Sequence, residues 1–183
     1  MRAIGLKTGE VRLTPHSPAW RRKFSAEKLR LKALLQPRHY TLEHIGSTAV
    51  PGLDAKPILD IAILIPSFRS LPRWIQALES AGYLYKGEYG LPGRHFFTRG
   101  NPVTHHLHLV TPETPHWADW LLFRDYLRAT PAAARQYNQT KKRLARRFAA
   151  NREAYTRAKT PLVTKLMRAA VQWQTQANKK SKK

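Results

Sequence analysis

The sequence predicts an α+β fold in which a sheet domain is extended by a basic helical block. Two observations indicate this class. Segments typical of strands occur between about residues 38 and 112, and from about residue 115 onward the apolar residues repeat at helical spacing. At 183 residues the chain suits one domain, which we expect to cover 1–176 and to leave 177–183 as a basic, disordered tail.

The first elements are predicted to be a helix and two strands. A helix is expected over 17–36, because Ser17 can cap it and Pro18 is tolerated in its first turn. Strands are expected over 41–46 and 58–65. The second of these is rich in Ile and Leu, which is typical of a buried strand.

The remainder of the sheet core is predicted to contain one helix and three extended segments. The helix covers 71–81, where apolar residues fall on one face. Extended segments over 83–89 and 95–98 flank the turn-forming sequence Gly-Leu-Pro-Gly at 90–93. Residues 104–110 form the last predicted strand.

The rest of the chain, about 115–176, is predicted to be helical. Pro131 and Pro161 fall where a proline in the first turn is tolerated, so each is expected to begin a helix. The predicted helices cover 116–129, 131–150, 152–159 and 161–176.

The composition excludes several classes of protein. There is no cysteine, so disulfides and thiolate metal sites are excluded. The N-terminus has no apolar core of signal-peptide length, and the longest apolar run, 58–66, is interrupted by Asp60 and is too short to span a bilayer. We therefore expect a soluble, cytoplasmic protein without membrane association.

The charge is strongly positive and unevenly placed. The chain has 33 Lys and Arg against 11 Asp and Glu, a formal charge of +22. Residues 134–183 contain 15 basic residues and one acid, Glu153. Such a field concentrates polyanions, so nonspecific nucleic acid binding through the helical block is one interpretation. The plainer interpretation, which we favour for 178–183, is that these charges keep the chain soluble.

The segment around Gly46, Ser47 and Thr48 is a candidate phosphate site. A strand that leads into a Gly-Ser turn leaves backbone N–H groups free, and the serine hydroxyl can add one hydrogen bond. Asp60 lies 13 residues beyond Ser47 in an apolar strand, where a carboxylate is costly unless it binds a metal or accepts hydrogen bonds. Alternatively, Asp60 lies at a solvent-facing edge and caps a turn, and the spacing leaves both possibilities open.

The segment HIGSTAVPGLDAKPILDI, residues 44–61, resembles the signature of the GrpB family, whose members have a nucleotidyltransferase-like fold. The resemblance covers nearly the whole chain from about Val11. It extends through HHLHLV (105–110), FRDYLR (123–128), the Tyr137-to-Lys141 step and the series Arg152, Tyr155 and Lys159. It implies a small mixed β-sheet of nucleotidyltransferase type flanked by helices, with a cleft for a nucleotide.

The resemblance also implies roles for particular residues. In active members of the wider fold the Gly-Ser turn holds a triphosphate, and carboxylates in an Asp-x-Asp pattern bind two magnesium ions. Gly46 and Ser47 match the turn, and Asp60 matches one carboxylate. Its neighbours at two-residue spacing are Ile58 and Ala62, so the second carboxylate of the pattern is missing.

The last predicted strand places His106 and His108 on one face, where the wider fold would offer an acid. With Asp60 they can bind one divalent metal; magnesium or manganese is the expected cofactor, and zinc is the less favoured choice. They can equally form a phosphate-binding patch, or His108 can act as a general base beside Asp60. A fourth interpretation is local hydrogen bonding on a half-exposed strand. Glu43 and Glu88 are the nearby acids that could complete a metal site; alternatively, Glu43 points to the same side as Ile45 and pairs with a basic helix.

Several residues of the helical block are further candidates. Arg124 and Asp125 are predicted to form an internal ion pair that docks a helix. Lys141 falls inside an apolar stripe that includes Tyr137, which is unusual unless its ammonium group reaches the cleft.

Basic residues elsewhere can also contact a phosphate. Arg152 and Lys159 flank Tyr155 on one helical face, and they either hold a phosphate or extend around a core tyrosine. We favour phosphate contact, because the family resemblance includes these positions. Lys56, just before the strand with Asp60, is another candidate anion ligand.

Three functions are therefore compatible with the sequence. The first is an enzyme that transfers a nucleotidyl or related phosphate-containing group to a small acceptor. The second is a module that binds a nucleotide or phosphorylated metabolite and has lost transfer activity. The third is a basic RNA-associating protein, which is supported only by charge. The sequence does not indicate the oligomeric state.

Overall fold

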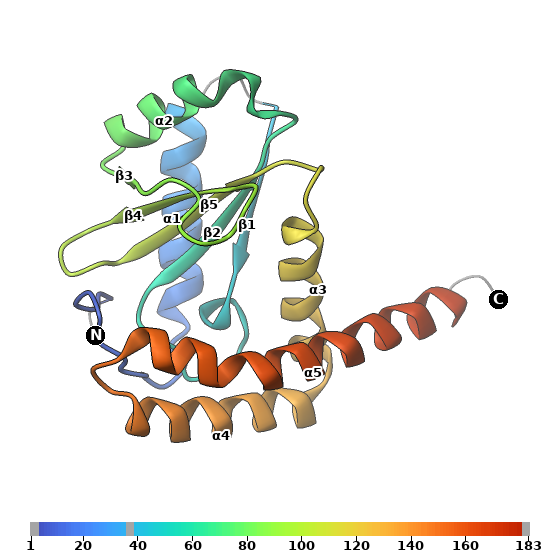
Figure 1. The fold of residues 1–183 in the computed structure, drawn as a ribbon. Coiled ribbons are helices and arrows are strands. Elements are labelled where there is room, and N and C mark those ends of the chain that lie inside the picture. The colour runs from blue at the N-terminus through green and yellow to red at the C-terminus, as the bar shows by residue number, and fades with distance from the viewer. Residues whose placement is uncertain (1–3, 36–38, 181–183) are drawn as a thin grey trace.

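The computed structural model describes residues 4–35 and 39–180, and it confirms the α+β class. Five strands form one sheet in the order β1-β2-β5-β4-β3 (Figure 1). β2 and β5 are parallel, and the other neighbouring pairs are antiparallel, so the sheet is mixed as expected. The strands are β1 (Thr41–Ile45), β2 (Leu59–Leu64), β3 (Leu84–Tyr85), β4 (Arg94–Arg99) and β5 (His105–Val110).

The register of the central strands places the candidate residues side by side. Asp60 on β2 lies opposite Ile45 on β1 and beside His106 on β5. Since side chains alternate between the two faces of a strand, His108 points to the same face as His106. The predicted placement of His106 and His108 on one face is therefore confirmed, and the register adds Asp60 to that face.

Two helices cover the opposite face of the sheet, α1 (Ala19–Leu34) and α2 (Leu71–Ser80). Their apolar side chains, among them Leu31 and Trp74, pack on strand residues such as Ile61 and Leu107, all nearly inaccessible to solvent. Burial of this many Ile, Leu and Trp side chains is the main driving force for the sheet domain. It also holds β2 and β5 in the register that forms the site.

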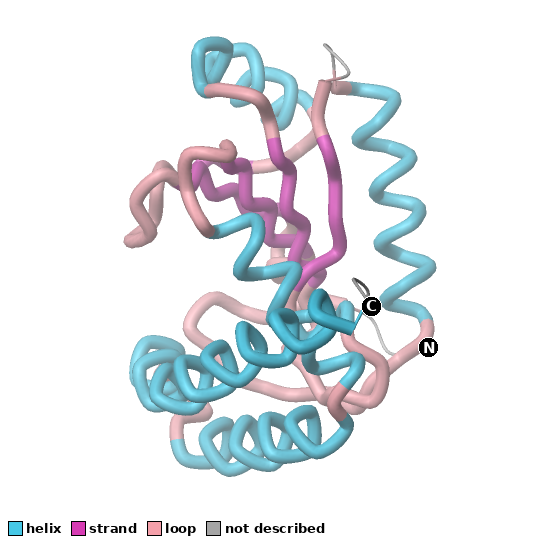
Figure 2. The backbone as a smooth tube through the Cα atoms, turned by 90° about the vertical axis from the view of Figure 1, so that its right-hand side faces the viewer, coloured by secondary structure: helices cyan, strands magenta, loops and turns pink. Residues whose placement is uncertain are grey.

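The C-terminal helices lie on the other side of the sheet from α1 (Figures 1 and 2). They are α3 (His116–Ala129), α4 (Pro131–Arg147) and α5 (Arg152–Lys180). A second apolar cluster joins them to the loop after β1, where Val50 and Leu53 pack with Tyr137 and Leu166. Among the helices that the structure describes, none has both the length and the apolar character required to cross a bilayer.

The last helix differs from its prediction. The expected helices 152–159 and 161–176 form one helix, α5, with Pro161 in its interior. Tyr155 before the proline and Leu166 after it are both buried against the rest of the protein, so packing on both sides outweighs the lost backbone hydrogen bond.

Other boundaries shift by a few residues. α5 continues to Lys180, so residues 177–180 are helical and not part of a disordered tail, while 181–183 lie outside the described residues. No Gly or Pro in 162–180 would end the helix earlier. α1 covers Ala19–Leu34, and the predicted end at residue 36 lies outside the described part of the chain.

Candidate functional site

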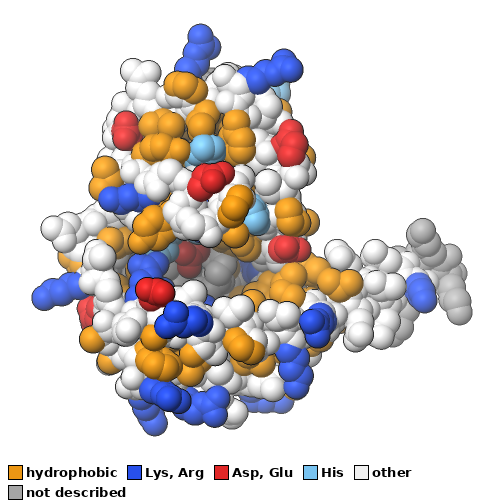
Figure 3. Space-filling view, viewed as in Figure 1, with side chains coloured by type: hydrophobic (Ala, Val, Ile, Leu, Met, Phe, Trp, Pro, Cys, Tyr) orange, Lys and Arg blue, Asp and Glu red, His pale blue; other side chains and the backbone are white. Residues whose placement is uncertain are grey.

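A cavity of about 530 Å³ lies between the sheet and the helical block. It opens as a hollow in the middle of the face shown in Figure 3. Its walls come from the turn after β1, from β2, β4 and β5, and from α3, α4 and α5. Asp60 is the one acidic residue among those that line it. The lining basic residues are Lys56, Arg94, Arg124, Lys141, Arg152 and Lys159.

The turn after β1 lies directly against Asp60. Gly46 has a φ of 69°, and a Cβ atom built on it would lie 2.5 Å from Asp60 Oδ2. Only glycine therefore fits here, both because of its positive φ and because the carboxylate occupies the space of a side chain. The sequence-based expectation that the Gly-Ser turn faces Asp60 across adjacent strands agrees with this geometry.

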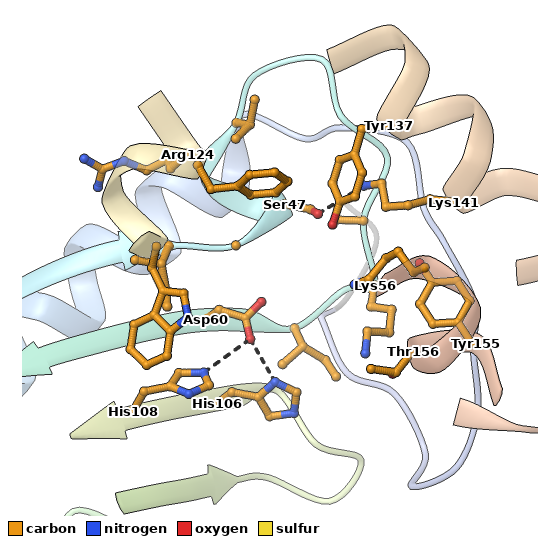
Figure 4. Close-up of a pocket in the computed structure, with 18 of the residues that line it drawn as sticks. Ser47, Lys56, Asp60, His106, His108, Arg124, Tyr137, Lys141, Tyr155 and Thr156 are labelled. Carbon is orange, nitrogen blue, oxygen red and sulfur yellow. Dashed lines mark hydrogen bonds and ion pairs between the residues drawn. The ribbon is translucent and has the colours of Figure 1, made fainter. Parts of the chain in front are cut away.

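Asp60 contacts two of the three histidines of β5, and the shorter contact is a hydrogen bond (Figure 4). His106 Nδ1 donates to Asp60 Oδ1 at 2.9 Å, and His108 Nε2 is 3.9 Å from the same oxygen. Arg152 Nη2 lies 3.4 Å from His106 Nε2, which is consistent with a proton on Nδ1 of that ring. Burial tends to raise the pKa of Asp60, but the polar and charge interactions with His106 and His108 outweigh it and hold that pKa well below its usual value.

His108 has a different electrostatic environment. Burial lowers the pKa of His108 below its usual value, and the neighbouring Asp60 only partly opposes this effect. The ring is thus largely uncharged at neutral pH, as required for a side chain that accepts a proton.

The donors around Asp60 do not fit the two-magnesium site of the wider fold. Magnesium prefers oxygen ligands, and among the described residues that line the cavity only Asp60 supplies a carboxylate. Within the described residues, no three His, Asp or Glu side chains are arranged to hold a metal ion. Asp60 can still be the protein ligand of a single magnesium or manganese ion whose other ligands are water and substrate phosphates.

The two acids considered as further ligands are used elsewhere. Glu43 Oε2 accepts a hydrogen bond from Arg124 Nη1 at 2.7 Å, and Arg124 also pairs with Asp125 at 2.8 Å. The predicted Arg124–Asp125 pair is therefore present. The Arg124 guanidinium points away from the Asp60 cluster (Figure 4), and it anchors α3 on β1. Glu88 Oε1 accepts from the backbone N–H of Gly93 and closes the turn before β4.

Four of the basic side chains that line the cavity are close enough to influence one another's charge: Lys56, Lys141, Arg152 and Lys159. Burial lowers the pKa of Lys56 to about 7, and the positive charge of Arg152 adds to the effect. Burial, followed by the charge of Lys159, also lowers the pKa of Lys141 to about 7. Burial and neighbouring positive charges disfavour the charged forms of these lysines. A bound anion would therefore stabilise those charged forms strongly.

Lys141 contacts the turn itself. Its side chain is 2% exposed, and Nζ donates to Ser47 Oγ at 3.1 Å and to the carbonyl oxygen of Asp54 (Figure 4). The ammonium group of Lys141 therefore reaches the cleft, as its place in the apolar stripe of α4 suggested. There it donates a hydrogen bond that holds the Ser47 hydroxyl in place. With this group as donor, Ser47 Oγ is left to donate its own hydrogen to a ligand.

Thr48 differs from its predicted role. It is 4% exposed and does not line the cavity, and its Oγ1 lies 3.0 Å from Nε2 of the buried His44. Residues 47–49 form a single 3₁₀ turn, which rotates Thr48 toward the core while Ser47 faces the cleft. The Thr48 side chain therefore stabilises the turn and does not line the cavity.

An aromatic wall next to Asp60 was not predicted. The Trp120 ring centroid lies 5.0 Å from that of His108, and Phe96 lies 5.1 Å from His108. Tyr89 stacks on Phe96 at 5.2 Å and is 64% exposed. The pairing of Phe96 with His108 follows from strand alternation, but the approach of Trp120 depends on the docking of α3, which the sequence does not reveal.

Solved structures define the class of the fold. Cid1 poly(U) polymerase, solved with MgGTP, matches with a TM-score of 0.50 at 16% identity over 73% of this chain and 44% of that chain. This similarity concerns the fold alone, and it places the sheet and its flanking helices in the nucleotidyltransferase-like class.

The chain belongs to the GrpB family. The family model described as GrpB protein matches residues 10–169. GrpB from Enterococcus faecalis matches with a TM-score of 0.81 at 35% identity, over 88% of this chain and 98% of that chain. A UPF0157 protein of Pseudomonas aeruginosa is 42% identical over 88% of this chain and 68% of its own length.

Proposed function

We propose that the cavity binds a nucleotide or a closely related phosphorylated small molecule. The observation that carries the proposal is a cavity lined by the Gly46-Ser47 turn and by four cations, with Asp60 as the one acid among the lining residues. The four cations are Lys56, Lys141, Arg152 and Lys159, and Lys141 contacts Ser47 directly. The turn can offer a serine hydroxyl and backbone N–H groups, and the cations can neutralise several phosphate charges. The volume of about 530 Å³ is in the range of small-molecule sites.

The aromatic wall favours a nucleotide over a simple phosphate. Trp120 and Phe96 border the same cavity as the cations, and Tyr89 is an exposed ring at its edge. Aromatic side chains bind planar bases by stacking, which contributes about 1–3 kcal/mol per base. A ligand with a planar group and a phosphate chain would use both ends of the cavity.

Group transfer is the second candidate function, and it rests on the Asp60–His108 pair. In such a reaction His108 would take the proton of an acceptor hydroxyl, Asp60 would stabilise the imidazolium, and the acceptor oxygen would attack the α-phosphorus while pyrophosphate leaves. A magnesium or manganese ion bound by Asp60 and the phosphates would stabilise the negative charge of the phosphates. The alternative is that the cleft binds its ligand without turnover.

The substitution Asp60→Asn distinguishes the binding proposal from the transfer proposal. In EDTA, we expect calorimetry to show that the variant binds ATP at least as tightly as the wild type, because a negative charge beside the phosphates has been removed. With magnesium or manganese and glycerol as acceptor, we expect pyrophosphate release from the wild type only. Flat titrations for both proteins would contradict the binding proposal, whereas binding without pyrophosphate release would contradict transfer alone.

Binding is expected to take up protons. At pH 8 the amines of Lys56 and Lys141, whose pKa values are about 7, are mostly uncharged, and a bound phosphate would raise both pKa values. ATP affinity should therefore fall as the pH rises from 7 to 9, with proton uptake that approaches one per lysine at pH 8. The measurement is the binding enthalpy at pH 8 in buffers of high and low ionisation enthalpy. Identical enthalpies would show that neither lysine gains a proton.

A further inference from the structure

The two sides of α4 carry different kinds of residue. Ala133, Tyr137, Lys141 and Leu144 are buried against the rest of the protein. At 100° per residue, Arg135, Lys142 and Arg146 lie on the opposite side, with Arg143 beside them and Arg147 at its edge. All five are exposed. We call this group the α4 basic face: Arg135, Lys142, Arg143, Arg146 and Arg147.

These charges are largely unused by the fold. Lys142 pairs with Asp54 at 3.0 Å. Within the part of the chain that the structure describes, Arg135, Arg143 and Arg146 have no ion pair, and Arg147 stacks on Phe148. α4 contains no Asp or Glu along its 17 residues. The face therefore has a positive potential that no neighbouring acid on its own helix reduces.

The spacing of the charges suits a phosphodiester chain. Arg135 and Arg146 are eleven positions apart, which corresponds to about 16 Å along a helix. Along the axis of a B-form duplex, in which each strand has one phosphate per 3.4 Å, this length spans about five phosphates of one strand. Lys142, Arg143, Arg146 and Arg147, with Gln139, line a shallow groove along the helix. Figure 3 shows Lys and Arg side chains along the lower edge, where Figure 1 places α4.

The composition of the face selects the class of partner. The apolar side of α4 is packed inward, and the large exposed hydrophobic residues of the described chain all lie outside α4. A membrane-surface helix inserts an apolar side, and protein interfaces centre on apolar and aromatic anchors. Guanidinium groups without such anchors are typical of contacts to a nucleic acid backbone.

We propose that the α4 basic face binds the phosphate backbone of nucleic acid without sequence preference. The site is separate from the cavity, because Lys141 on the same helix points to the opposite side, into the cleft. Binding at this face therefore does not depend on the proposed nucleotide site.

The test measures the binding of a fluorescein-labelled 20-nucleotide single-stranded RNA as a function of salt. The variant replaces Arg135, Arg143, Arg146 and Arg147 by Gln, which keeps helix propensity and leaves Lys142–Asp54 intact. Each lost contact reduces the slope of log K against log salt by about 0.7 for a single strand. We expect the slope to fall by about 3 and the affinity at low salt to fall by about tenfold or more.

The matched control removes the same number of charges from α1 and α2, with Arg21, Arg22, Lys32 and Arg73 replaced by Gln. All four are exposed on α1 and α2. The control variant should keep nearly the wild-type slope of log K against log salt. A polyglutamate peptide should compete poorly with the RNA for the wild-type protein. Equal losses in both variants would overturn the proposal, since they would show a diffuse effect of net charge. Tighter binding of polyglutamate than of RNA would overturn it in favour of an acidic protein partner.

Discussion

Replacing Lys56 and Arg152 together by Met is expected to reduce the affinity for ATP by roughly 10²–10⁴-fold. Both side chains line the cavity, and the Lys56 ammonium has no hydrogen-bond partner within the described residues, so it is free for a ligand. A hydrogen bond from a charged group contributes about 1.5–3 kcal/mol, so two of them give about 3–6 kcal/mol. Calorimetric titration of ATP at constant ionic strength measures the effect.

The control for this prediction is the pair Arg73→Met and Lys86→Met. These residues are exposed on α2 and after β3, outside the residues that line the cavity, and the net charge falls by the same amount. We expect the affinity for ATP to change less than threefold, because salt screens the interactions of exposed charges beyond about 10 Å. A similar loss of affinity in both variants would mean that net charge, and not this cavity, attracts the ligand.

Gly46→Ala is the second substitution with a large expected effect. The added Cβ would lie 2.5 Å from Asp60 Oδ2 and would force the turn away from the carboxylate. We expect a loss of ATP binding below detection and a lower free energy of unfolding, by more than the roughly 1–2 kcal/mol that a positive φ costs a residue with a Cβ. Urea unfolding and calorimetry measure the two effects.

Gly52→Ala separates strain from contact. Gly52 has a similar φ of 78°, but a Cβ there would meet nothing within 4 Å. The free energy of unfolding of this variant should fall only by the cost of the positive φ. Its affinity for ATP should be close to that of the wild type. If Gly46→Ala bound ATP as well as Gly52→Ala does, the approach of the turn to Asp60 would have no part in the site.

The part of the site built from strands could be predicted from the sequence. His106 and His108 share a face because side chains alternate along a strand, whereas the register of β2 on β5 places Asp60 beside them. A Gly-Ser pair alone is weak evidence, and the Gly46-Ser47 turn was recognisable through Asp60 on the next strand and through the resemblance to the GrpB signature. The alternation along each strand needs no knowledge of how distant segments pack.

Features that depend on packing were beyond the sequence. Thr48 turns inward because it can reach the buried His44, a contact that a residue pattern does not encode. Trp120 reaches His108 because α3 is docked by Arg124 on Glu43, 81 positions away. The continuity of α5 through Pro161 likewise reflects burial on both sides of the proline, which overrides the local preference of that residue.

The most direct test of the central claim is a crystal structure of the protein with a non-hydrolysable ATP analogue. We predict that its phosphates lie within hydrogen-bonding distance of Ser47, Lys56 and Arg152, with the base against the wall that contains Trp120. Phosphate density outside this cavity, with the side chains of Lys56 and Arg152 unchanged, would contradict the account.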